Sequence, residues 1–183
     1  MRQFHQQYQE WSRLPLPPRG WPPVPQTDLS NGGDPSSVIC LWDGATRCGL
    51  HSAGGIVLLT PSGQVLLETG VQFEDIDESM LVELIAHREV ILWCLANGFV
   101  EVRFHGNAKV IIEKIQQAYT RDSRLGIILE DVCRLLVAHS GFSVRYVGRR
   151  NNREAHLVAR KAISLYSTSC SSFAFLSWLN SRV

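Results

Sequence analysis

VICLWDGA (residues 38–45) is a short apolar run that closes on an acid, a glycine and an alanine. Such a run between polar and glycine-rich segments is typical of a buried β-strand, which we expect to end at Asp43. Residues 53–59 (AGGIVLL) predict a second strand and residues 64–73 a third. Pro61-Ser62-Gly63 is a turn signal, so these two strands should pair as a hairpin. Together the three strands predict an antiparallel meander.

Helical spacing of apolar residues begins after the meander. Asp77 or Ser79 can cap a helix that ends at Asn97-Gly98, and Asn107 can cap a shorter helix reaching residue 118. Residues 124–139 carry an apolar stripe at helical spacing, and Asn152 opens a final helix. Residues 100–104 and 142–147 are short strands between these helices. The order βββ-α-β-α-α-β-α predicts an α/β (α+β) fold, with a five-stranded mixed sheet flanked by helices. Its three antiparallel strands are followed by two parallel additions.

Three segments differ in composition. Residues 1–37 contain seven of the eight prolines, which favours an extended or disordered lead-in. Residues 38–166 hold all the predicted elements and form the domain. Residues 167–183 are rich in serine and aromatic residues, and we expect a loosely docked extension there.

Overall composition excludes several protein classes. The chain has 183 residues, 45% of them hydrophobic, and a formal net charge of +1, which argues against a strongly basic or acidic binder. No apolar run approaches the roughly 18 residues of a membrane helix, and the first residues do not read as a secretory signal. The five cysteines are widely spaced and form no Cys-x-x-Cys pair. We therefore expect an intracellular, soluble protein without a zinc site, its compartment and oligomeric state being open.

The near-zero net charge conceals two opposed regions. Residues 68–89 contain seven acids and a single arginine, Arg88. Residues 145–161 contain six basic residues and a single acid, Glu154. An acidic cleft beside a basic patch is one reading of this pattern, and two solvated surfaces are the other.

Four motifs occur in order on the expected elements. They are DGA (43–45) with AGGI (53–56) and SGQVLL (62–67), then ELIAHRE (83–89), then FHGN (104–107), then RRNNREAH (149–156). Over residues 38–165 this arrangement resembles the ribonuclease H-type, "reverse transcriptase-like" domains that are abundant in plant genomes and related to retroelements. The resemblance implies the ribonuclease H fold.

The resemblance also implies a chemistry. Active members hydrolyse the RNA strand of RNA–DNA hybrids with two Mg²⁺ ions held by four carboxylates. Two hard cations roughly 3.5–4 Å apart repel each other, so the site needs that much negative charge. Asp43 and Glu83 match two of the four positions and are the expected catalytic, metal-binding residues. Without the resemblance, Asp43 is an ordinary turn residue and Glu83 an ordinary solvated charge.

This chain departs from the family pattern at the other two positions. Asn107 offers a neutral carbonyl oxygen and is also a good helix N-cap. His156 offers an imidazole, which suits softer metals than Mg²⁺ and is otherwise a surface or cleft histidine. The remaining acids leave a two-metal site underneutralised, so at most one Mg²⁺ should bind, and weakly.

Binding of nucleic acid needs only positive charge and shape, so it can persist where chemistry is lost. Arg145, Arg149, Arg150 and Arg153 lie beside the expected site and could hold phosphates of an RNA–DNA hybrid or RNA. Three functions remain open: a nucleic-acid-binding domain with little or no nuclease activity, an active metal-dependent hybrid ribonuclease, and a non-catalytic protein-interaction remnant. The sequence leaves undecided whether the protein is an enzyme.

Overall fold

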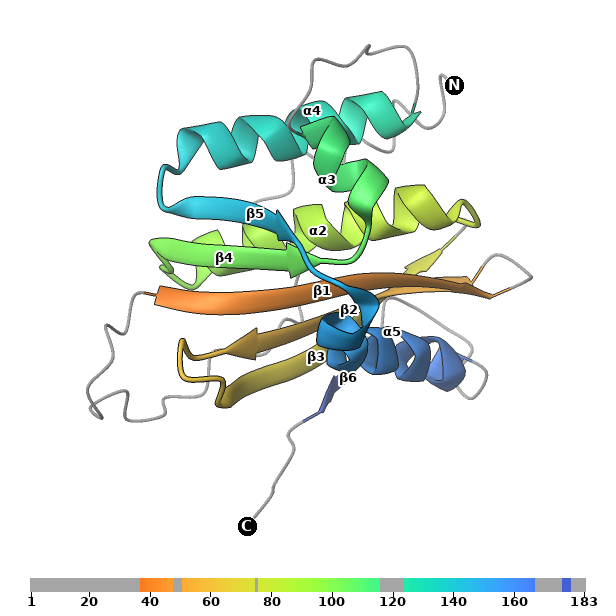
Figure 1. Cartoon of the computed structure of the whole chain (residues 1–183). Helices are drawn as coiled ribbons and strands as arrows, with labels where there is room; N and C mark the ends of the chain where they lie inside the picture. The colour runs from red at the N-terminus through yellow and green to blue at the C-terminus, as the bar shows by residue number, and fades with distance from the viewer. Residues whose placement is uncertain (1–36, 48–50, 75, 116–123, 167–175, 179–183) are drawn as a thin grey trace.

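The computed structural model describes residues 37–47, 51–74, 76–115, 124–166 and 176–178. Its centre is a mixed sheet with the strand order β5-β4-β1-β2-β3-β6 (Figure 1). Strands β1 (Ser37–Arg47), β2 (His51–Leu59) and β3 (Val65–Glu74) pair antiparallel. Strands β4 (Glu101–Gly106) and β5 (Phe142–Tyr146) are added parallel to β1. The predicted meander with two parallel additions is confirmed.

Two details of the sheet differ from the prediction. Strand β1 does not end at Asp43 but continues to Arg47, because Gly44 to Arg47 pair with Gly54 to His51 of β2. A short sixth strand, β6 (Leu176–Trp178), pairs antiparallel with β3 at Glu68, Thr69 and Gly70. This strand lies in the segment that was expected to be a loose extension.

The helices form a layer on each face of the sheet. Helices α2 (Ser79–Ala96), α3 (Lys109–Ile115) and α4 (Arg124–Ala138) lie on one face, and α5 (Arg153–Tyr166) lies on the other (Figure 1). A short 3₁₀ helix, η1 (Arg149–Asn152), leads into α5. The larger core lies between the sheet and α2, where Trp42, Ile85 and Phe104 are among the fully buried side chains. Cys40 and Cys94 are free thiols within this core.

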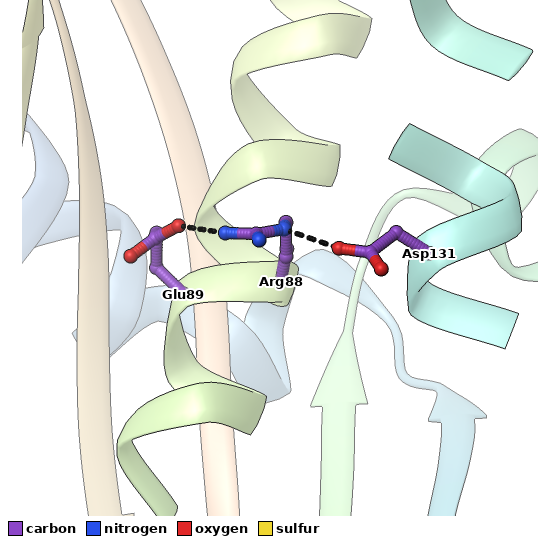
Figure 2. Close-up of polar contacts among 3 residues, drawn as sticks. All are labelled: Arg88, Glu89 and Asp131. Atoms are coloured by element: carbon purple, nitrogen blue, oxygen red, sulfur yellow. Dashed lines mark hydrogen bonds and ion pairs between the residues drawn. The ribbon is translucent and has the colours of Figure 1, made fainter. Parts of the chain in front are cut away.

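Helix α2 is buried on two sides, since it packs between the sheet and α4. An ion-pair network crosses its contact with α4 (Figure 2). Arg88 donates through Nη1 to Oε1 of Glu89 at 2.7 Å and through Nε to Oδ2 of Asp131 at 2.6 Å. The Arg88 side chain is only 7% exposed, so the pair with Asp131 of α4 satisfies a cation that would otherwise be costly to bury.

Two glycines set the helices against the sheet. A Cβ added to Gly44 of β1 would come within 2.7 Å of the Cα atom of Glu83, so only glycine lets α2 approach this closely. On the opposite face, a Cβ on Gly55 of β2 would overlap the backbone of Ala155 and Ala159 in α5. The glycine of the DGA motif therefore brings α2 to the strand that carries Asp43, and a glycine of the AGGI motif brings α5 to the neighbouring strand β2.

Some predictions fall outside the described residues: the lead-in up to residue 36, the end of the helix expected to reach residue 118, and residues 167–175 and 179–183 of the extension. Within the described part of the chain, no helix is long and apolar enough to cross a membrane.

Candidate functional site

A cavity of about 790 Å³ opens where β1 and β4 end between α2 and α5. It gathers polar groups from β1, from α2, from the residue that follows β4, and from η1 with α5. Its lining residues include Asp43, Glu83, Asn107, His156 and Arg149, together with Arg47, Ser79 and Arg160. The four positions predicted from the family motifs are thus brought together in one cavity.

Asp43 and His156 form a direct pair across the cavity. The imidazole Nδ1 of His156 lies 2.7 Å from Oδ2 of Asp43, and because an ionised carboxylate can only accept, the ring N–H is the donor of this hydrogen bond when Asp43 is ionised. Burial raises the pKa of Asp43, while the neighbouring His156 and Arg149 act in the opposite direction. One oxygen of the Asp43 carboxylate is therefore already bonded to a side chain of the same protein.

Glu83 approaches the site from the other face of the sheet. Because Gly44 has no side chain, the backbone of Glu83 lies against β1 and its carboxyl group reaches the cavity that Asp43 lines. Burial, together with the negative charge of Asp43, raises the pKa of Glu83 to about 7. Near neutral pH this carboxyl group is therefore partly protonated, unlike an ordinary exposed glutamate.

Asn107 follows β4 and is held by a second asparagine. The fully buried Asn152 donates through Nδ2 to Oδ1 of Asn107 at 2.7 Å and to the backbone oxygen of Trp42 at 2.8 Å. The hydrogen bond between Asn152 and Asn107 thus connects the end of β4 with η1. We expected this residue to be either an N-cap or a metal ligand, and its side-chain hydrogen bond with Asn152 serves a third purpose. Nothing about Asn107 alone indicates that partner.

The four predicted arginines do not share one position. Arg149 lines the cavity, whereas Arg145, Arg150 and Arg153 are exposed on the surface outside it. Two arginines outside that predicted set also line the cavity, Arg47 at the end of β1 and Arg160 on α5. Arg160 lies four residues after His156 on α5, and this helical spacing places the two on one face. No sequence pattern indicated Arg47 as a cavity residue, because the strand was predicted to end at Asp43, before Arg47.

The donor set can be compared with what a pair of Mg²⁺ ions requires. One Asp43 oxygen is bonded to His156, and Oδ1 of Asn107 accepts a hydrogen bond from Asn152. Three arginines line the same cavity as the two carboxylates. Among the residues that the structure describes, no group of three or more His, Cys, Asp or Glu side chains is arranged to hold a metal ion. The side chains present do not match a site of four acids.

Comparisons with known proteins identify the family and the fold. A family model described as "Reverse transcriptase-like" matches residues 41–162. The ribonuclease H1 of the halophilic archaeon Halobacterium salinarum is similar in structure, with a TM-score of 0.64 and 23% identity over 70% of this chain and 98% of that one. No curated protein sequence matches the chain.

Two similar structures contain nucleic acid. The LC11 ribonuclease H1, isolated from compost by a metagenomic approach, was solved in complex with an RNA/DNA hybrid; its TM-score is 0.64, with 17% identity over 72% of this chain and 100% of that one. A foamy viral protease–reverse transcriptase was also solved with an RNA/DNA hybrid. Its TM-score is 0.59, with 12% identity over 80% of this chain and 23% of the viral protein.

Proposed function

Because this chain belongs to the reverse transcriptase-like family and has the ribonuclease H fold, we propose that it binds nucleic acid and has weak or no nuclease activity. The observation that carries this proposal is the pairing of Asp43 with His156 in the cavity where the family positions converge. The imidazole of His156 occupies one oxygen of the Asp43 carboxylate through a hydrogen bond. It supplies none of the negative charge that a carboxylate at the position of His156 would supply. The alternative of an active ribonuclease is favoured only by Asp43 and Glu83 lining that cavity.

Two divalent ions do not fit this donor set. Mg²⁺ demands near-octahedral oxygen ligands, and Asp43 and Glu83 alone cannot offset two such ions. Arg47, Arg149 and Arg160 add positive charge to the same cavity. At most one Mg²⁺ should bind weakly to Asp43 and Glu83, where it would polarise a phosphate oxygen. The residues in place favour a phosphate group over a metal pair.

Phosphate binding has direct support from the charges at the cavity. Arg149 lies at its mouth in η1, and Arg150 and Arg153 follow it on the exposed surface. Guanidinium groups bind phosphate oxygens in a bidentate manner, and such binding does not depend on base sequence. We therefore expect sequence-independent, salt-sensitive binding of an RNA–DNA hybrid or of RNA.

The first experiment measures binding of a fluorescent RNA–DNA hybrid in EDTA over a series of salt concentrations. Affinity should fall steeply as salt rises, and Arg149→Gln should reduce the logarithmic slope by about 0.9 for the lost phosphate contact. Arg134→Gln is the matched control, since Arg134 is exposed on α4, does not line the cavity, and loses the same charge. Absence of salt-dependent binding at low ionic strength would contradict the proposal and leave the protein-interaction remnant as the better reading.

The second experiment separates weak chemistry from absent binding. The wild-type chain should bind labelled hybrid but leave it essentially intact in Mg²⁺ or Mn²⁺. Efficient cleavage that is abolished by Asp43→Asn would establish the active ribonuclease instead. The double substitution Asn107→Asp with His156→Asp supplies the two missing acids, and should produce measurable Mg²⁺-dependent cleavage if only these positions have lost function. A double variant that folds, binds hybrid and stays inert would place the defect elsewhere.

A further inference from the structure

The outer part of the sheet has an uncovered face beside α5. Neighbouring residues of paired parallel strands share a face, and Leu41 of β1 pairs with His105 of β4, which pairs with Arg145 of β5. Leu41 packs against Ala155 and Val158 of α5. The side chains of His105 and Arg145 therefore lie on the face that α5 covers further along the sheet.

Helix α5 does not extend over β4 and β5. It packs against β1, β2 and β3, and no other described element of the chain packs on this part of the face (Figure 1). The uncovered side chains are Arg103 and His105 of β4 and Ser143 and Arg145 of β5, which we call the β4–β5 face. The alternate residues, including Phe104 and Phe142, are buried in the main core on the other side of the sheet.

The β4–β5 face has a net positive charge from two arginines that are not ion-paired. Arg103, Arg145 and Ser143 are exposed, and in the described residues no carboxylate lies within ion-pair distance of either arginine. Burial, and next the positive charges of Arg103 and Arg145, lower the pKa of His105, so both arginines lie close to this ring. Glu101, two residues before Arg103, is exposed on the same face of β4 and lowers its net positive charge without forming an ion pair with Arg103, and Glu154 lies at the start of α5.

This face is continuous with the arginines at the cavity. Strand β5 ends at Tyr146, and the backbone N–H of Val147 donates to the oxygen of Gly106, so the chain leaves β5 beside the end of β4. It then enters η1, which carries the exposed Arg150 and the cavity residue Arg149. The basic side chains of η1, at the end of the sheet, are thus continuous with those of the β4–β5 face.

We propose that a single-stranded extension of the bound nucleic acid leaves the cavity over η1 and follows the β4–β5 face, where Arg103 and Arg145 bind its phosphates. The inference rests on the proposed function and specifies the form of its ligand. A duplex has a persistence length of about 150 base pairs and does not turn such a corner, whereas a single strand does. Positively charged grooves that follow a flexible backbone are the usual means of binding single strands.

The experiment compares two probes in EDTA: a short blunt RNA–DNA hybrid, and the same hybrid carrying an unstructured oligouridine or oligothymidine extension at each end in turn. In the wild-type chain one polarity of extension should raise affinity roughly three- to tenfold and steepen the logarithmic salt dependence by about 1.4, or about 0.7 for each of two phosphates. Arg103→Glu and Arg145→Glu should each remove most of this gain, and Arg103→Glu, which lies outside the set of arginines expected to hold the hybrid, should leave blunt-hybrid affinity within about twofold.

Arg134→Glu is the matched control, since Arg134 is exposed on α4 and the substitution changes the charge equally. Arg103→Gln and Arg145→Gln keep the test valid if a charge reversal disturbs the sheet. Equal affinity of the wild-type chain for blunt and extended hybrids would overturn this inference and leave the proposed function standing. Equal loss of the gain in Arg134→Glu would also overturn it. Failure to bind either probe would overturn the proposed function itself.

Discussion

His87 is the most unusual single residue of the core. Its ring stacks on Trp42 with centroids 4.5 Å apart and planes within 1° of parallel, and the edge of Phe104 lies nearby. Among the described residues neither ring nitrogen has a hydrogen-bond partner. Burial lowers the pKa of His87 to about 3, so the folded protein holds a neutral imidazole that behaves as an aromatic packing element.

This burial makes the fold sensitive to acid. In the unfolded chain the histidine takes up a proton below about pH 6.5, whereas in the folded chain it does so only below about pH 3. The stability that the buried neutral ring of His87 contributes is therefore fully present above pH 6.5 and is lost as the pH falls from 6.5 to about 3. His87→Phe keeps the ring, so urea unfolding should show several kcal/mol less acid-induced loss over this range. His139→Phe, the same substitution at a half-buried position, is the comparison variant. An unaltered profile in His87→Phe would assign the acid sensitivity to other groups.

Glu83 should show the opposite pH dependence. Its pKa is about 7 in the folded chain and about 4.5 when unfolded, so ionisation destabilises the fold as pH rises through this interval. Glu83→Gln should raise the free energy of unfolding by about 1–2 kcal/mol at pH 8, allowing for the solvent-exposed part of the group, with little change at pH 4. The exposed Glu113→Gln serves as control in the same urea titrations. A pH-independent effect in Glu83→Gln would mean that packing and not charge dominates.

At the scale of secondary-structure elements, the contact of α2 with α4 depends on Arg88 and Asp131 (Figure 2). Asp131→Ala should cost about 2–4 kcal/mol, since it leaves a guanidinium buried with one carboxylate fewer. The exposed Lys109–Glu113 pair of α3 is the control, because Glu113→Ala should cost under about 0.5 kcal/mol. Arg88→Met combined with Asp131→Leu should recover most of the loss. If thermal melts show that Asp131→Ala and Glu113→Ala destabilise the protein equally, burial does not strengthen the Arg88–Asp131 pair.

Most elements could be predicted because local patterns specify them. The run 38–42, the turn at Pro61-Ser62-Gly63 and the apolar spacing of α4 and α5 each reflect burial of one face or of a whole strand. The end of β1 and the existence of β6 depend on pairing with β2 and β3, which is not a local property. A three-residue strand such as β6 has no periodicity of its own to read.

At the scale of the whole molecule, the order of the motifs predicted that four residues converge in one place: Asp43, Glu83, Asn107 and His156. It did not predict which side chains these residues contact. The Asp43–His156 and Asn107–Asn152 bonds join residues more than forty positions apart, and only the assembled fold brings them within reach. The roles of these four residues and of the four arginines stay predictions. Arg47 was missed because its position depends on the paired length of β1.

Strand β6 provides a test of the whole sheet. It covers part of β3, whose backbone groups at Glu68, Thr69 and Gly70 would otherwise form an exposed edge. Exposed edges pair with other chains, so removal of residues 167–183 should promote self-association. Three ladder positions contribute little to stability, so the melting temperature should fall by only a few degrees, about 1 kcal/mol or less. A chain ending at Trp178 keeps β6 and is the matched control. Light scattering and size-exclusion chromatography at increasing protein concentration should separate the two, and identical monomeric profiles would show that the edge of β3 needs no cover.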